Sequence, residues 1–189
     1  MAEAQDFWSS YVPDDTAPSN VRKFLHRDSR NPTYGQTTGH YAYAYAGAFE
    51  RLVTVAISTY PQADYLRLPL FFLARHAAEL HLKEVIQDYC TASGVPYDAA
   101  GVHSLMTLWN RATNLVRIPL EDEWSAHVGR LIQHMHDFDP NGQRFRYPDD
   151  NDGEPFQHTR VELVSLADAH ATITLWCEGA IDYLNASRE

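Results

Sequence analysis

The chain has 189 residues, enough for one domain with a substantial core, and its 44% hydrophobic and 21% charged content is typical of a globular protein. Its 25 acidic and 15 basic residues give a net charge of −10, which argues against a DNA-coating protein or a binder of anionic membranes. No segment approaches the roughly 20 apolar residues of a membrane span, and the N-terminus shows no signal-like run. Since Cys90 and Cys177 form no recognisable framework, a reduced, cytoplasmic compartment is expected.

Residues 1–39 are predicted to form an irregular N-terminal arm, because proline and glycine punctuate them closely. Within this arm the segment 21–30, VRKFLHRDSR, is the densest run of cations in the chain. It could contact a nucleic acid or an acidic partner, or it could be a solvated arm. The rest of the chain, 40–189, is predicted to be a helical domain.

The segment 40–60 carries two competing periodicities. Tyr41, Tyr43 and Tyr45 alternate with alanine, which is typical of a strand. A stripe at helical spacing runs through the same residues, namely Tyr41, Tyr45, Ala48, Phe49, Leu52 and Ala56. The abundance of alanine favours the helix. The tyrosines are then predicted to pack in the core rather than to form a base-stacking platform.

Four further helices are predicted, over residues 65–92, 104–116, 121–138 and 162–185. The first should become regular near Pro69 and end at Gly94, while Pro140 and Gly142 should end the third. A long polar loop follows over 139–160. Because most of the connections are short, the expected fold class is an all-α antiparallel bundle of about five helices.

The helix over 65–92 carries a polar stripe. Phe72, His76, Glu79 and Lys83 fall within about 60° of arc, and Arg75 flanks them. Charges in i,i+4 pairs could satisfy one another on a solvated face. Apolar residues cover most of the helix circumference, however, and this favours a partly buried polar cleft in which the charges pair or meet a ligand.

Histidines mark two other places. His103 directly precedes the helix over 104–116, where its ring could bond free backbone amides or project into a cleft. The helix over 121–138 has one polar face, which could handle protons but is more simply a solvated face: Glu123, His127, Arg130, His134 and Asp137. His127 and His134 lie about 10 Å apart along the helix axis, too far to share one ion, so neither a metal site nor a cofactor is predicted.

The polar loop contains Arg144, Arg146, Tyr147 and Asp149 around the sequence RFRYPDD. Two guanidinium groups and an aromatic ring could clamp a phosphate and stack a base. The acidic residues after them do not fit the spacing of an EF-hand, so a calcium loop is set aside.

Three motifs occur in a fixed order: Glu79 and Lys83 as Glu-x-x-x-Lys, His103 and Leu105 as His-x-Leu, and Arg-Tyr-Pro-Asp over 146–149. In this order they resemble the HEPN superfamily, small α-helical modules that bind nucleotides or RNA, some of which cut RNA. The resemblance implies a HEPN-like domain over 40–189 that forms a homodimer.

The ribonuclease branch of that superfamily uses an arginine followed, after four to six residues, by a histidine. Arg75/His81 and Arg130/His136 meet this spacing, but chance alone would produce about as many matches. On a continuous helix the two members of each pair point about 120° apart, although they could meet across the two-fold axis of a dimer.

If the chain cuts RNA, the residues expected to act are Arg75, His76 and Glu79, with His76 as the base, Arg146 holding the phosphate and Glu79 orienting either of them. A further set is expected to bind the nucleotide or RNA: Lys83, His103, Arg144, Arg146, Tyr147 and Asp149.

The resemblance thus implies an RNA-directed protein of bacterial defence or toxin–antitoxin type, in one form a metal-independent endoribonuclease. An alternative is a non-catalytic nucleotide- or RNA-binding module that works with a partner protein such as a nucleotidyltransferase encoded nearby. A third is a helical adaptor whose polar stripe is a dimer seam.

Overall fold

The computed structural model of the chain describes residues 37–117, 122–149, 152–156 and 160–188. Within these ranges the fold is all-α, as predicted, with five α-helices, a short 3-10 turn and no strand: α2 Thr38–Ser58, η1 Asp64–Leu66, α3 Arg67–Ser93, α4 Leu105–Val116, α5 Glu123–Phe138 and α6 Leu163–Ala186. None of the described helices combines the length and hydrophobicity needed to cross a bilayer. The predicted N-terminal arm lies almost wholly outside the described residues.

Local sequence signals set the helix ends. The side chain of Thr37 accepts a hydrogen bond from the His40 amide at 3.1 Å, and Ser104 accepts one from Thr107 at 3.3 Å. These oxygens satisfy amides that have no partner within the first turn of a helix. α3 ends at Gly94, whose φ of 67° lies in the left-handed region that glycine adopts without strain. The helix boundaries predicted from the sequence are confirmed to within about two residues.

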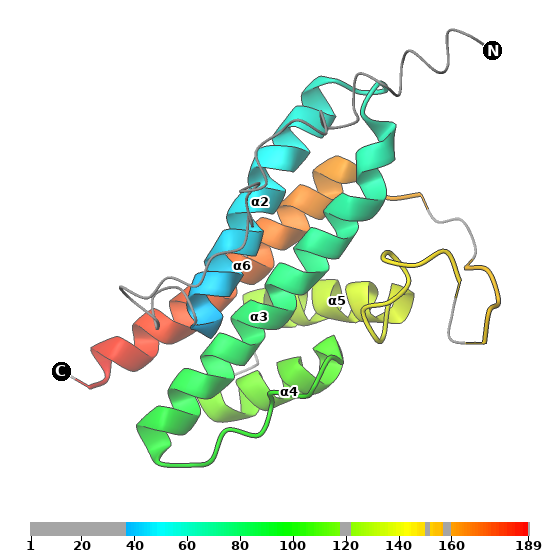
Figure 1. Cartoon of the computed structure of the whole chain (residues 1–189). Coiled ribbons are helices and arrows are strands. Elements are labelled where there is room, and N and C mark those ends of the chain that lie inside the picture. Colours follow the sequence, from blue (N-terminus) through cyan, green and yellow to red (C-terminus); the bar gives the residue numbers. More distant parts are fainter. Residues whose placement is uncertain (1–36, 118–121, 150–151, 157–159, 189) are drawn as a thin grey trace, which may run out of the picture. The chain divides into compact units, whose positions relative to one another are not determined.

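α3 is the central helix of the bundle and packs against α2, α4 and α6. Figure 1 shows α2 running antiparallel to α3 and α6, with α4 and α5 on the side of α3 that faces away from α2. The Tyr89 hydroxyl donates to the Ala180 carbonyl at 2.9 Å and ties α3 to α6. Because neighbours surround α3, its polar residues are enclosed as well.

Aromatic residues fill the space between α4, α5 and α6. The rings of Trp109 and Trp176 lie 4.5 Å apart, and the Trp176 indole donates to the Ser125 hydroxyl at 3.0 Å. This space is continuous with the core of the whole bundle, whose largest fully buried apolar side chains come from all five helices: Phe49, Leu70, Leu82, Val85, Ile86, Leu105, Leu108, Val128, Ile132, Ile173 and Trp176. Indole and hydroxyl satisfy each other, so the burial of Trp176 leaves no polar group without a bond.

The segment 40–60 is helical, as predicted, but the stripe that it buries differs from the predicted one. Its buried residues are Ala42, Ala46, Phe49, Val53 and Ala56. Tyr41 and Tyr43 are 49% and 76% exposed, so the prediction that the tyrosines pack in the core is wrong for these two. Alanines allow α2 and its neighbours to approach closely, and the bulky phenol rings are displaced to the outside.

The polar face of α5 is exposed, as expected for a solvated surface: Glu123, His127, Arg130, His134 and Asp137. The opposite face is buried through Ser125, Val128, Ile132 and Met135, whereas Trp124 is 40% exposed because it lies in the first turn of the helix. These exposed side chains provide matched controls for substitutions in the interior.

Candidate functional site: a buried ionic cluster

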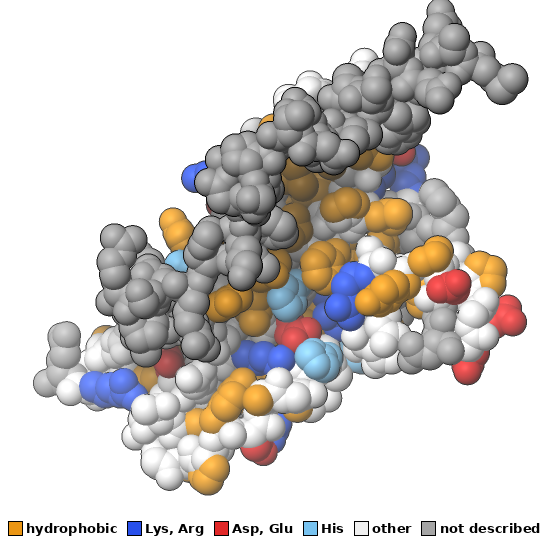
Figure 2. Space-filling model, viewed as in Figure 1, with side chains coloured by type: hydrophobic (Ala, Val, Ile, Leu, Met, Phe, Trp, Pro, Cys, Tyr) orange, Lys and Arg blue, Asp and Glu red, His pale blue; other side chains and the backbone are white. Residues whose placement is uncertain are grey.

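An ionic cluster, called the Glu79 cluster below, joins α3 to the start of α4 and the end of α5: Arg75, Glu79, Lys83, His103 and Asp139. Figure 2 shows acidic, basic and histidine side chains gathered on one face, with hydrophobic side chains beside them. Arg75, Glu79 and Lys83 are only 2%, 3% and 7% exposed. The burial of the stripe that the sequence favoured is therefore confirmed for these three residues, and the interpretation as a solvated face is wrong.

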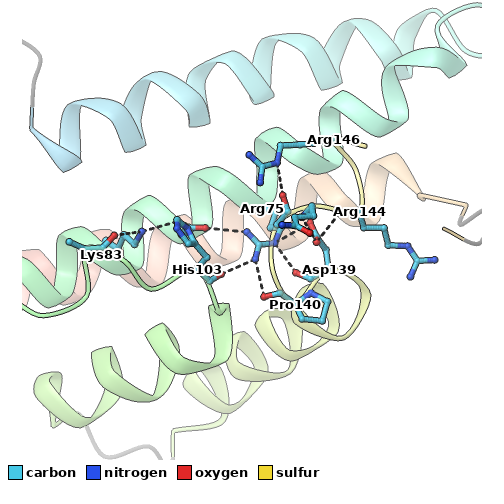
Figure 3. A network of polar contacts seen from close by, with 11 residues as sticks. Arg75, Lys83, His103, Asp139, Pro140, Arg144 and Arg146 are labelled. Carbon is cyan, nitrogen blue, oxygen red and sulfur yellow. Dashed lines mark hydrogen bonds and ion pairs between the residues drawn. The ribbon is translucent and has the colours of Figure 1, made fainter. Parts of the chain in front are cut away.

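Arg75 is the centre of the cluster, and its guanidinium group bonds to three segments of the chain (Figure 3). Its Nε donates to the Asp139 carbonyl at 3.0 Å, and one terminal nitrogen donates to the His103 carbonyl at 2.9 Å. The other terminal nitrogen donates to Glu79 Oε2 at 3.2 Å. A planar fork can hold several acceptors at once, so Arg75 fixes the geometry of the site. This geometry favours a positioning role over the direct catalytic role expected from the sequence.

Glu79 is a buried carboxylate bound by three basic side chains, those of Arg75, Lys83 and His103. Its Oε1 accepts from Lys83 Nζ at 2.8 Å and lies 3.0 Å from His103 Nδ1, while Arg75 contacts Oε2. Burial raises the pKa of this carboxyl, but the Lys83 hydrogen bond and charge, together with His103, outweigh it and leave the pKa below its usual range. Glu79 is thus ionised at neutral pH. Lys83 also donates to the Ala100 carbonyl at 3.3 Å, which makes it a buried partner of Glu79 rather than a free cation for a ligand.

His103 is the exposed member of the cluster, with 62% of its side chain accessible. An ionised carboxylate can only accept, so His103 Nδ1 carries the proton and donates it to Glu79. In the neutral imidazole this leaves Nε2 as an acceptor. Because its side chain is exposed, the ring projects from the cluster. The amides at the start of α4 are capped by Ser104 and not by His103.

The loop after α5 closes the cluster through Asp139. Its Oδ1 accepts from the amides of Gln143 and Arg144 at 2.8 and 3.2 Å, and its Oδ2 lies 3.3 Å from Arg75 Nε. Gly142 has a φ of 74°, and a Cβ atom there would lie 2.8 Å from a terminal nitrogen of Arg75. The turn thus needs glycine both for its backbone and for the space that Arg75 occupies.

Gly142→Ala is expected to lower the free energy of unfolding by about 2–3 kcal/mol, because a left-handed alanine is strained and its methyl group displaces Arg75. Gly153→Ala is the matched control, since Gly153 has a φ of 80° and no atom of the described residues lies within 4 Å of the added atom. The control should cost about 1 kcal/mol from backbone strain alone. Urea unfolding of both variants measures the difference, and equal losses would contradict the proposed packing against Arg75.

His76 lies beside the cluster in an aromatic setting. Its ring makes an edge contact with Tyr45 at 4.5 Å and stacks on Phe72 at 5.6 Å. Burial lowers the pKa of His76, against the opposing effect of Glu79. The imidazole is therefore neutral at pH 7.

The two arginines of the loop are separated rather than joined into one clamp. The Arg146 guanidinium carbon lies 5.6 Å from the rings of both Phe72 and Tyr147, and its Nε donates to the Gly142 carbonyl at 2.6 Å. Arg144 instead lies near the rings of Phe138 and Phe156. Residues two apart in a tight turn point to different sides, and Figure 3 shows the side chain of Arg144 directed away from that of Arg146.

Asp149, the last residue of the Arg-Tyr-Pro-Asp motif, is placed apart from the cluster. It is exposed and forms an isolated antiparallel bridge with Pro155. Among the described residues no hydrogen bond or ion pair joins it to the Glu79 cluster. Its expected part in ligand binding stays a prediction.

Neither arginine–histidine pair meets within the chain. His81 is 5% exposed and lies 3.7 Å from Glu84, while Arg75 faces the α5 loop. Arg130 is exposed, and the Nδ1 of His136 is buried without a hydrogen bond to any of the described residues. A contact of such a pair across a dimer axis stays a prediction.

Asp139 and Gly142 belong to the candidate site but were missed in the sequence analysis. Both belong to the sequence Asp-Pro-Asn-Gly, which was interpreted only as the end of a helix. An aspartate that starts such a turn often caps the amides that follow it, and this signal could have singled out Asp139.

Within the described ranges no three histidine, cysteine, aspartate or glutamate side chains are arranged to hold a metal ion. No model of a known protein family matches the chain, and neither a curated protein nor a solved structure similar to it was found. Fold and site together define an all-α helical bundle with a buried ionic cluster whose histidine faces outward.

Proposed function

We propose that this protein binds RNA at the exposed side of the Glu79 cluster and cuts it without a metal ion, as an RNA-directed HEPN-type protein of bacterial defence or toxin–antitoxin systems. The observation that carries the proposal is the bond between Glu79 and His103, in which a buried carboxylate orients an exposed imidazole. A carboxylate that holds one ring nitrogen leaves the other ready to accept a proton.

The charged and basic side chains of the site form two layers, and their arrangement favours the binding of an anionic ligand. In the inner layer Arg75 and Lys83 balance Glu79 and Asp139. The outer layer consists of His76, His103 and Arg146, of which Arg146 is exposed and always charged. An approaching phosphate thus meets a cation and two imidazoles in a chain that is acidic as a whole.

In the proposed reaction His103 Nε2 takes the proton of a ribose 2′-hydroxyl, whose oxygen attacks the adjacent phosphorus. The bond from phosphorus to the 5′ oxygen breaks, that oxygen takes a proton from water, and a 2′,3′-cyclic phosphate remains. Arg146 offsets the charge that develops on the phosphate. His103 replaces His76 as the proposed base, because His76 is surrounded by rings whereas His103 has a carboxylate partner.

The alternative is a non-catalytic RNA- or nucleotide-binding module that acts with a partner protein. It is favoured because Arg75 and Lys83 donate their hydrogen bonds to groups of the protein itself. Few cations are then left at the site to stabilise a transition state. This alternative predicts binding that depends on Arg146 without any turnover.

The test is incubation of tRNA and single-stranded RNA in EDTA with the wild type, His103→Ala, His76→Ala and Arg146→Ala. Wild type should leave 2′,3′-cyclic ends, and His103→Ala should lower the rate by about 100-fold or more. Glu123→Gln and His127→Ala, which alter exposed residues of α5, should cut as the wild type does. Thermal melting of each variant separates loss of fold from loss of chemistry.

Intact RNA at all protein concentrations, with binding that Arg146→Ala abolishes, would replace the nuclease with the binding module. If the protein neither cuts nor binds RNA, an RNA-directed function is rejected. A change of oligomeric state in Glu79→Ala without any effect on a ligand would instead indicate the helical adaptor.

A further inference from the structure

A concave site lies near the Glu79 cluster, between the α2–α3 connection and the loop that follows α5. It is a pocket of about 570 Å³, within the usual range for small-molecule sites. One residue links the two sites, because Tyr147 lines the pocket and Arg146 lies 5.6 Å from its ring. A ligand bound at Arg146 could therefore continue into the pocket.

Aromatic rings line this pocket and face solvent. Tyr60, Tyr65 and Tyr147 are 55%, 75% and 56% exposed, and Phe156 forms another part of the wall. These three exposed tyrosines, two from the α2–α3 connection and one from the loop after α5, are not needed for the core. Flat faces of this kind stack unpaired nucleobases in proteins that bind single-stranded RNA.

The charges of the pocket are mainly positive. Arg67, Arg144 and Arg160 line it, against Asp64 as the acidic residue. Arg67 is fixed by bonds to Asp64 and to the Val161 carbonyl, and it lies 5.3 Å from the Tyr60 ring. Arg160 is 76% exposed, and Glu162 is 3.9 Å away. In a chain with a net charge of −10, this excess of cations selects for an anion.

We propose that the pocket binds one nucleotide, with the base stacked on Tyr65 and Tyr147 and the phosphate held by the arginines. In an RNA strand this nucleotide is the neighbour of the phosphodiester at the Glu79 cluster, a placement that rests on the proposed function. A free nucleotide has the same chemistry, and the experiment distinguishes the two sources.

Two probes are titrated by fluorescence anisotropy and calorimetry. One is a labelled single-stranded RNA with methylated 2′-hydroxyls, which cannot be cut, and the other is adenosine monophosphate, with ribose 5-phosphate as the base-free comparison. Tyr65→Ala should weaken binding of the RNA about 5- to 100-fold, the effect of losing one stacked base. Tyr65→Phe should restore it. Tyr43→Ala is the matched control, since Tyr43 is 76% exposed on α2 outside the pocket.

If Tyr65→Ala weakens binding of the RNA, the pocket is supported as a subsite for one nucleotide of the strand. An effect on adenosine monophosphate alone, with ribose 5-phosphate bound more weakly, supports the pocket with a free nucleotide as its ligand. The proposal is overturned if the wild type binds neither probe or if Tyr65→Ala changes neither affinity. If Tyr65→Ala leaves RNA cutting and the affinities for both probes unchanged, the nuclease is upheld and the pocket is rejected. If the wild type binds nucleotide through Tyr65 but cuts no RNA, the pocket is upheld and the nuclease is rejected.

Discussion

Arg75→Met should lower the free energy of unfolding by about 3–5 kcal/mol, a cost expected when one partner of a buried ion pair is removed. The methionine fills much of the space but leaves the Asp139 carboxylate, whose side chain is 3% exposed, without its cation. It also leaves the carbonyls of Asp139 and His103 without the donors that Arg75 provides. Three segments then lose their common anchor.

Urea unfolding, followed by circular dichroism, measures the loss. Arg130→Met is the control, because Arg130 is exposed on α5 and its replacement should change stability by less than about 0.5 kcal/mol. Arg75→Lys should fall between the two, since it keeps the charge but not the planar fork. A loss below about 1 kcal/mol in Arg75→Met would mean that the cluster contributes little to the fold.

Glu79→Gln should be similarly destabilising, by about 3–5 kcal/mol, although it changes few atoms. The amide cannot neutralise Arg75 and Lys83, both of which are buried beside it. Addition of Lys83→Met should recover a substantial part of the loss, because Arg75 keeps Asp139 as its partner and the cation left without a carboxylate is then removed as well. Without such recovery, the coupling between Glu79 and Lys83 would be refuted.

The same residue predicts a dependence of stability on pH. The pKa of Glu79 lies below its ordinary value of 4.5 in the folded protein, because Lys83 and His103 outweigh the effect of burial. Its stabilising contribution is therefore complete above about pH 4.5 and is lost as the pH falls through the folded-state pKa. Glu79→Gln should lack this acid-dependent step, and a series of urea unfolding curves against pH would reveal the difference.

The polar stripe shows how far sequence reasoning extends into the site. Glu79 and Lys83 lie one helical turn apart, so their ion pair follows from the spacing. The burial of the stripe followed from the apolar residues on the rest of α3. The bond between His103 and Glu79 spans 24 positions and the one between Arg75 and Asp139 spans 64, and no periodicity reports contacts between separate helices.

The tyrosines of α2 show a second limit of prediction from the sequence. The helix and its period were predictable, but the phase of the buried stripe was not: Ala46 and Val53 are buried, whereas Tyr43 is 76% exposed. Which stripe is buried depends on how closely the neighbouring helices approach. That distance is a property of the assembled bundle.

By itself the sequence determined the all-α class, the positions of the five described helices and the polar character of one face of α3, because periodicity, caps and helix breakers act over a few residues. Only the tertiary structure decided that Arg75 is an internal anchor, that His103 is oriented by Glu79 and that Arg144 and Arg146 point apart. These roles depend on which carbonyls and carboxylates from distant segments come within hydrogen-bonding distance, and packing of the whole bundle sets those distances.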